Sequence, residues 1–301
     1  MPHSLSRDLT LALCSIFPRG IVALDFETTG ISPLGDKIIE VAAVKIKPDA
    51  PIEIFESLVN PQKRISEQNF AIHNISNEMI EHAPLIGEVL PKFTRFLESL
   101  PIIAHNAKFD IGFLVMALHD LKMPFSPSQI FDSCKLARYT HKEATNHKLK
   151  TLIEHLNLPA IENHHRALDD SWACLNIFAH GIQKLQESDA LSTLKEKAYL
   201  FSIDDFSPQK SFDIPAHLKP LLQLMQKENG VALGQGPVIE IIYKGGTTPG
   251  GPRKIVPLSF LPMPLGSVLQ AHCLESDQIK TYSLRKVRSY KVLAETREEY
   301  N

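Results

Sequence analysis

Residues 21–30 read IVALDFETTG, a run of four apolar residues followed by two carboxylates that are separated by one residue. The apolar run predicts a buried β-strand over residues 20–25, and the Thr-Thr-Gly predicts the loop that follows it. Because side chains alternate across a strand, Asp25 and Glu27 point to one face and Phe26 points to the other, into the core. This spacing places two carboxylates within reach of one cation.

The pattern on either side of this stretch predicts further strands and helices. Two apolar segments at 37–47 and 52–59 predict strands, and a third short strand is predicted at 102–104. Helical spacing predicts helices at 86–100, 107–121, 131–139, 149–156 and 167–184. Three strands followed by a helix, a strand and more helices are typical of an α/β protein with a ribonuclease-H-like mixed sheet. The strand that carries Asp25 and Glu27 is expected to be central.

Composition and charge predict more than one module. The net charge is −2, and residues 1–230 hold 23 basic and 28 acidic residues, whereas residues 231–301 hold 9 and 6. We expect a first domain at 1–184 that begins with a helix at 1–17, a partly helical connector at 185–230, and a small, mostly β domain with a basic surface at 231–301. No segment approaches the ~20 apolar residues of a membrane span. We therefore expect no membrane partner. The four cysteines are far apart and form no Cys-x-x-Cys pair, which favours free thiols in a reducing compartment, and we expect a cytoplasmic protein.

Two later stretches contain further residues that are able to take part in catalysis. Residues 104–110 read AHNAKFD and end on Asp110, and residues 165–170 read HRALDD. His165 and Asp170 fit a His-x-Ala-x-x-Asp pattern. Asp169 competes with Asp170, since it follows His165 by four residues, the spacing that places two side chains on one helix face. His164 competes with His165, but only His165 has an alanine two residues later.

Four acids and one histidine suit metal-dependent hydrolysis of a phosphodiester. Oxygen ligands favour Mg²⁺ or Mn²⁺ over zinc. Two such ions ~4 Å apart stabilise the attacking and the leaving oxygen of an in-line displacement. A histidine with an ordinary pKa of ~6.5 is suited to take a proton from the attacking water near neutral pH.

Four motifs in this order resemble those of the DEDDh-type 3′–5′ exonucleases, the family of the proofreading epsilon subunit of bacterial replicative DNA polymerase. The motifs are DFETTG at 25–30, IHNI at 72–75, HNAKFD at 105–110 and HRALDD at 165–170. The resemblance implies that two Mg²⁺ or Mn²⁺ ions bind to Asp25, Glu27, Asp110 and Asp170 and that His165 is the general base. It further implies a binding site for the terminal nucleotide that is formed by Thr28, Thr29, His73, Asn106 and Phe109.

The activity implied by this resemblance is hydrolysis at nucleic acid 3′ ends, single-stranded or frayed, with release of 5′-monophosphates in DNA proofreading or repair. DNA polymerase subunits are then a further class of partner. Two alternatives stay open: a nuclease that trims RNA 3′ ends, and a non-catalytic protein that binds or senses nucleic acid.

The basic C-terminal region has a weaker resemblance of its own. IIYK at 241–244, RKIVPL at 253–258 and TYSLRKV at 281–287 are similar to segments of WYL-type β modules. Ser267-Val268-Leu269 stands where that family has its tryptophan, tyrosine and leucine. The resemblance implies contact with an anionic partner or ligand.

Overall fold

The computed structural model describes residues 4–159, 166–227, 235–245 and 250–300. Its contacts divide the chain into two units. The first unit comprises residues 1–28, 38–65 and 70–205, and the second comprises residues 29–37, 66–69 and 206–301. The second unit therefore includes two short segments from the N-terminal half of the chain as well as the C-terminal region.

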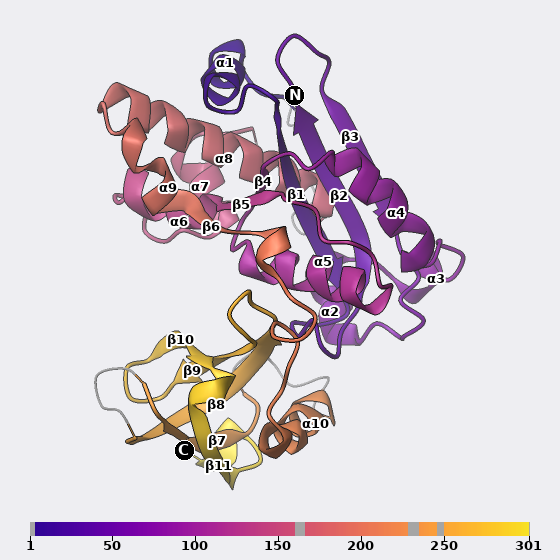
Figure 1. Ribbon diagram of the computed structural model, residues 1–301, viewed down its shortest axis with the longest axis vertical. Helices are drawn as coiled ribbons and strands as arrows, with labels where there is room; N and C mark the ends of the chain where they lie inside the picture. The colour runs from indigo at the N-terminus through magenta and orange to yellow at the C-terminus, as the bar shows by residue number, and fades with distance from the viewer. Residues whose placement is uncertain (1–3, 160–165, 228–234, 246–249, 301) are drawn as a thin grey trace. The chain divides into compact units, whose positions relative to one another are not determined.

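The first unit contains a mixed sheet of six strands in the order β3-β2-β1-β4-β5-β6 (Figure 1). The strands are β1 Ile21–Thr28, β2 Ile38–Ile46, β3 Glu53–Leu58, β4 Ile102–Ala104, β5 Gln129–Asp132 and β6 Tyr199–Ser202. β1, β2 and β3 pair antiparallel, β4 and β5 run parallel to β1, and β6 is antiparallel to β5. The predicted ribonuclease-H-like α/β class is confirmed, with β1 in the interior of the sheet.

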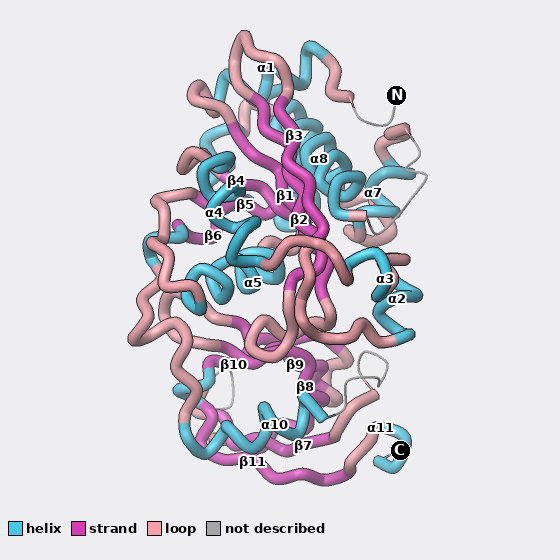
Figure 2. Tube along the Cα trace, turned by 90° about the vertical axis from the view of Figure 1, so that its right-hand side faces the viewer, coloured by secondary structure: helices cyan, strands magenta, loops and turns pink. Residues whose placement is uncertain are grey.

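Helices cover both faces of this sheet. Their bounds are α1 Arg7–Ile16, α2 Glu67–His73, α3 Asn77–Ile80, α4 Ile86–Leu97, α5 Lys108–Asp120, α6 Ser133–Thr140, α7 Leu149–His155, α8 Ala167–Glu187 and α9 Leu194–Ala198. α8 and α7 lie on one side of β1–β3, and α4 and α5 lie on the other, as the two views in Figures 1 and 2 agree. The faces of β2 are covered by this packing, and all of its residues are buried. The long apolar helix α8 packs against β1 and β2.

The structure corrects the expected boundaries between residues 129 and 202. The helix predicted at 131–139 begins only at Ser133, because Phe131 and Asp132 belong to β5. The Asp132 side chain accepts a hydrogen bond from the Lys135 backbone N–H at 3.1 Å and so caps the helix. β6, within the expected connector, is an edge strand of four residues and too short to give a clear hydrophobic period.

The second unit is built on an antiparallel sheet with the order β10-β9-β8-β7-β11. Its strands and main helix are β7 Val238–Tyr243, β8 Pro252–Leu261, β9 Val268–Cys273, β10 Gln278–Ser283, β11 Val287–Ala294 and α10 Lys219–Lys227, and a short helix α11 spans Arg297–Tyr300. The core of this unit includes Ile239, Ile241 and Phe260 on the sheet, with Leu34 packed against it. The expected small, mostly β C-terminal region is therefore present.

The ten-residue strand β8 contains two prolines, which normally interrupt central strands. β8 begins at Pro252, and the ladder between β8 and β9 shifts register between Pro257 and Ser259. An irregularity there accommodates a residue without a backbone N–H. Across the part of the chain that the structure describes, no helix combines the length and apolar character needed to cross a membrane.

Candidate metal centre and active site

The two carboxylates of β1 point to the face that α8 covers. Phe26, between them, is buried and its ring lies 5.8 Å from that of Phe93 in α4, on the opposite face. Side chains alternate along a strand, so Asp25 and Glu27 project together toward α8. The expected spacing of the two acids is therefore realised on one face of a central strand.

Helix α8 brings a third carboxylate to the same place. One carboxylate oxygen each of Asp25, Glu27 and Asp170 lie within 4.8 Å of one another. Asp170 is buried, and its backbone N–H donates to the Arg166 carbonyl at 3.0 Å in the first turn of α8. Asp169 is not a member of this group. We call Asp25, Glu27 and Asp170 the carboxylate cluster.

Asp110 lies next to the carboxylate cluster in the first turn of α5. Its Oδ1 accepts a hydrogen bond from the Phe26 backbone N–H at 3.1 Å, which ties the side chain to β1 between the other two acids. Asp110 is also among the negative charges that raise the pKa of Asp25. The four acids predicted from the sequence are therefore brought together from β1, α5 and α8.

Burial and the charges of neighbouring acids shift the pKa values of Asp25, Glu27 and Asp110 in the metal-free chain. Burial, followed by the negative charges of Asp110 and Asp170, raises the pKa of Asp25 well above its ordinary value. Burial and the charge of Asp170 raise the pKa of Glu27 to about 9. Burial raises the pKa of Asp110 to about 8, although the Phe26 N–H opposes the shift. Carboxylates buried close together repel one another when they are ionised. They therefore ionise together only when a positive charge is bound among them.

The donor set fits a hard divalent cation. The cluster offers only carboxylate oxygens, which Mg²⁺ and Mn²⁺ prefer, and their separation allows one ion to contact several of them. A bound cation would replace the repulsion between the acids with attraction. Asp25, Glu27 and Asp170 are the residues that would hold it, with Asp110 beside them.

We expect these acids to make the metal-free protein less stable at higher pH. The pKa of Glu27 is about 9 and that of Asp110 about 8 in the folded chain, against ordinary values of ~4.3 and ~3.9 in the unfolded chain. Between the unfolded and the folded pKa values, the folded state binds more protons than the unfolded state. The stability that these two groups contribute is therefore complete at acid pH and is lost as the pH rises through 8 and 9.

Thermal unfolding in EDTA between pH 7 and 9 tests this expectation, with the variant Glu27→Gln as the reference. The melting temperature of the wild type should fall relative to that of the variant as the pH rises, and Mn²⁺ should reduce the difference. A difference that is constant across this range would contradict the assigned direction of the pKa shifts.

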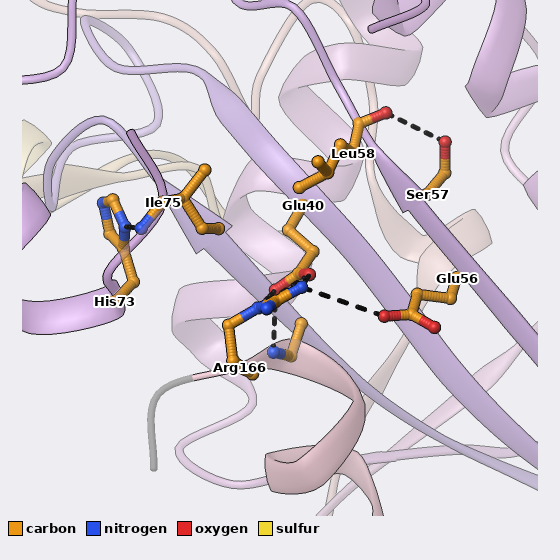
Figure 3. A network of polar contacts seen from close by, with 8 residues as sticks. Glu40, Glu56, Ser57, Leu58, His73, Ile75 and Arg166 are labelled. Carbon is orange, nitrogen blue, oxygen red and sulfur yellow. Dashed lines mark hydrogen bonds and ion pairs between the residues drawn. The ribbon is translucent and has the colours of Figure 1, made fainter. Parts of the chain in front are cut away.

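The residues predicted to bind the terminal nucleotide occupy different environments. Thr28 is buried at the end of β1. His73 ends α2, and its Nδ1 accepts the Ile75 backbone N–H at 3.0 Å (Figure 3). Asn106 is exposed and has a left-handed backbone with φ of 62°. Phe109 is partly exposed in α5. Asn106 and Phe109 are thus accessible to a ligand, whereas Thr28 and His73 are largely enclosed.

Thr29 belongs to the second unit and shapes the loop at 29–37. Its hydroxyl accepts the Lys37 backbone N–H at 3.0 Å, and its own N–H donates to the Lys37 carbonyl at 2.8 Å. The carboxylate of Asp36 lies so close to Gly30 that a β-carbon there would clash with it. The Thr-Thr-Gly motif therefore closes this loop, and a side chain at position 30 would force the Asp36 carboxylate to shift.

The predicted general base, His165, and its competitor His164 lie outside the described residues. The next residue, Arg166, is described, and sequence reasoning overlooked it together with its partner Glu40. Glu40 lies within the apolar run IIEVAAV of β2 and is fully buried. A charged residue in such a run implies a buried partner, and this signal could have been used. Figure 3 shows the guanidinium of Arg166 against the Glu40 carboxylate.

A second group with metal-ligand chemistry lies elsewhere in the first unit and consists of His141, Glu143 and His155. The Lys184 ammonium donates to Glu143 at 2.7 Å and lies 3.5 Å from Nδ1 of His141. Burial, together with the charge of Lys184, lowers the pKa of His141 to about 4. The Lys184 ammonium thus supplies the positive charge at this group. We interpret the group as a polar contact between α8 and the segment after α6.

Comparison with known proteins identifies the family of the first unit. The model of a family described as "Exonuclease" matches residues 22–178, just over half of the chain. The chain is similar to the PolC-type DNA polymerase III of Caldanaerobacter subterraneus subsp. tengcongensis, with 40% identity over 166 residues, 55% of this chain and 12% of that protein. For the PolC-type DNA polymerase III of Clostridium perfringens the identity is 38% over 191 residues, 62% of this chain and 13% of that protein.

The chain therefore spans only about an eighth of the length of these relatives. Among solved structures, exonuclease X in complex with 5′ overhanging duplex DNA matches at 27% identity and a TM-score of 0.43, covering 56% of this chain and 93% of that one. The family match ends at residue 178, so the resemblance of residues 231–301 to WYL-type modules stays an expectation. The order of the acidic motifs and the carboxylate cluster are consistent with the family match. The chain belongs to the exonuclease family.

Proposed function

We propose that this chain is a metal-dependent 3′–5′ exonuclease that hydrolyses phosphodiester bonds at nucleic acid 3′ ends and releases 5′-monophosphates. The observation that carries the proposal is the carboxylate cluster, three acids from two elements whose ligand oxygens lie within 4.8 Å of one another in a member of the exonuclease family. Such an all-oxygen site suits two-metal hydrolysis of phosphodiesters.

DNA is the substrate that we favour, in proofreading or repair. The support is the similarity to PolC-type DNA polymerases, which extends over 55% and 62% of this chain for the two relatives compared. Polymerase subunits are accordingly the partner class that we propose for the chain.

The residues of the chain would divide the work as follows. Asp25, Glu27 and Asp170 hold Mg²⁺ or Mn²⁺, two ions in our proposal, and Asp110 supports them beside β1. Bound divalent ions lower the pKa of water and stabilise charge on the attacking and leaving oxygens. We assign to His165 the removal of a proton from the attacking water, on the basis of its spacing to Asp170.

The direct test uses the full chain with single-stranded DNA and RNA oligonucleotides of the same sequence, each labelled at the 5′ end. With Mn²⁺ we expect products that shorten stepwise from the 3′ end, faster for DNA, together with nucleoside 5′-monophosphates. EDTA should stop the reaction. An oligonucleotide blocked by a 3′-phosphate serves as the control for attack at the 3′ terminus.

The outcomes separate the alternatives. Faster degradation of RNA would replace the DNA assignment with RNA trimming. Binding of 3′ ends without cleavage in Mn²⁺ would favour a non-catalytic binding protein and end the exonuclease proposal.

A further inference from the structure

We propose that Glu40 is a positioning residue that holds Asp170 at the carboxylate cluster through Arg166 and the first turn of α8. The inference rests on the proposed function, because the position of Asp170 matters for the reaction only if the cluster holds the catalytic ions. It assigns a role to a buried acid that none of the four exonuclease motifs contains.

Glu40 lies within the sheet but outside the carboxylate cluster. In the register of β1 and β2 it stands directly opposite Glu27. Residues opposite each other in an antiparallel pair project to the same face, so Glu40 also points toward α8. Its side chain is 1% exposed. A carboxylate so deeply buried is unfavourable unless it is paired and hydrogen-bonded.

Both oxygens of Glu40 are used by the start of α8. The Arg166 Nε lies 3.1 Å from Oε1 and 3.2 Å from Oε2, and its terminal nitrogen donates to Oε1 at 2.6 Å. The backbone N–H of Ala167 donates to Oε2 at 2.9 Å. The planar guanidinium fork fixes direction as well as distance, which a lysine ammonium would not do.

The contact with Ala167 gives the helix a cap that its own sequence lacks. Arg166 is the N-cap residue of α8, and its side chain makes no capping hydrogen bond. The Glu40 carboxylate takes that role from another strand and places negative charge at the helix N-terminus. The start of α8 is thereby attached to β2.

The attachment reaches the carboxylate cluster through one turn of helix. The Asp170 N–H donates to the Arg166 carbonyl at 3.0 Å, so the position and rotation of Arg166 determine where Asp170 points. Asp25 and Glu27 are carried by β1, the strand paired with β2. Glu40 therefore links the two elements whose acids must converge.

Glu56 of β3 offers a matched control. It lies 3.9 Å from the same terminal nitrogen of Arg166, but its side chain is 47% exposed (Figure 3). A solvent-exposed ion pair of this kind contributes little to stability, so Glu56 does little to hold Arg166 in place. A variant of Glu56 therefore removes one negative charge near Arg166 and leaves the helix cap intact.

The experiment compares Glu40→Gln, Arg166→Lys and their double variant with Glu56→Gln and the wild type. Three quantities are measured on the full chain: Mn²⁺ affinity by titration calorimetry, kcat and KM on 3′-terminal DNA, and the melting temperature in EDTA. All kinetic and binding measurements are made well below the melting temperature of the least stable variant.

We expect Glu40→Gln and Arg166→Lys to lower kcat and Mn²⁺ affinity by roughly 10- to 100-fold, the usual effect of removing a partner that orients a metal ligand. KM should change by no more than about twofold, because substrate contacts are retained. The double variant should lose little more than either single variant, since both act through one contact. Glu56→Gln should resemble the wild type.

A purely structural role would lower the melting temperature and leave kcat and Mn²⁺ affinity of the folded variants unchanged, and this result would overturn the proposal. If Glu40→Gln does not fold, Arg166→Lys decides, because it retains the positive charge and the Ala167 contact. A wild type that binds Mn²⁺ but cuts nothing would end the proposed function. In that case the Mn²⁺ affinities of the variants still decide whether Glu40 positions Asp170.

Discussion

Replacing Asp25 with asparagine is expected to abolish cleavage while the protein stays folded. Asp25 belongs to the carboxylate cluster and interacts electrostatically with Asp110, Asp170 and Glu27 at once. An amide retains the shape of the side chain but loses the charge that holds a divalent ion. Since divalent ions held at such a site would stabilise the transition state by several kcal/mol, a loss of at least about 10³-fold in kcat is expected.

The same substitution should stabilise the metal-free protein. Burial and four neighbouring acids raise the pKa of Asp25, so its charged form is disfavoured in the folded chain. Removing the charge relieves that repulsion, and we expect a higher melting temperature in EDTA at pH 8 but a smaller rise on adding Mn²⁺.

Asp49→Asn is the control for both measurements. Asp49 is exposed and has φ of 55°, a left-handed conformation that asparagine also adopts readily. The Asp49→Asn variant should cut DNA at the wild-type rate. Retention of activity in Asp25→Asn would remove Asp25 from the proposed metal site.

The second large effect distinguishes two adjacent acids. Asp170→Asn is expected to lower kcat by about 10³-fold, because Asp170 is a member of the carboxylate cluster. Asp169→Asn is expected to have little effect, because Asp169 is only partly buried and lies outside that group. Single-turnover rates on 3′-terminal DNA, with saturating Mn²⁺, give the comparison.

Each variant is the control for the other, since both change one carboxylate to an amide in the first turn of α8. Equal losses would show that charge at the helix N-terminus matters rather than one ligand. A larger loss for Asp169→Asn would reverse the assignment and call for a different rotation of the helix.

The local sequence predicted the strand and its two acids well, because strand periodicity depends only on neighbouring residues. β1 is observed at Ile21–Thr28, and Phe26 separates two acids on one face as expected. The long periodic segments at α4, α5 and α8 were also found. β6 was missed, since a strand of four residues is too short to show a clear alternation.

Contacts between distant parts of the chain could not be predicted in this way. The bond from the Phe26 N–H to Asp110 joins residues 84 positions apart, and that from Arg166 to Glu40 joins residues 126 positions apart. Neither follows from a local pattern, because each depends on which helix packs on which strand and in what rotation.

By itself, the sequence determined that acids suited to a divalent ion follow an apolar strand and recur twice later in the chain, because alternation and motif order are properties of neighbouring residues. The motif pattern favoured Asp170 over Asp169, and the tertiary structure places Asp170 with Asp25 and Glu27. Only the tertiary structure showed that the buried Glu40 caps the helix that carries Asp170. The physical reason is that a charge is tolerated in the interior only where packing supplies its partner, and packing is decided by the whole fold.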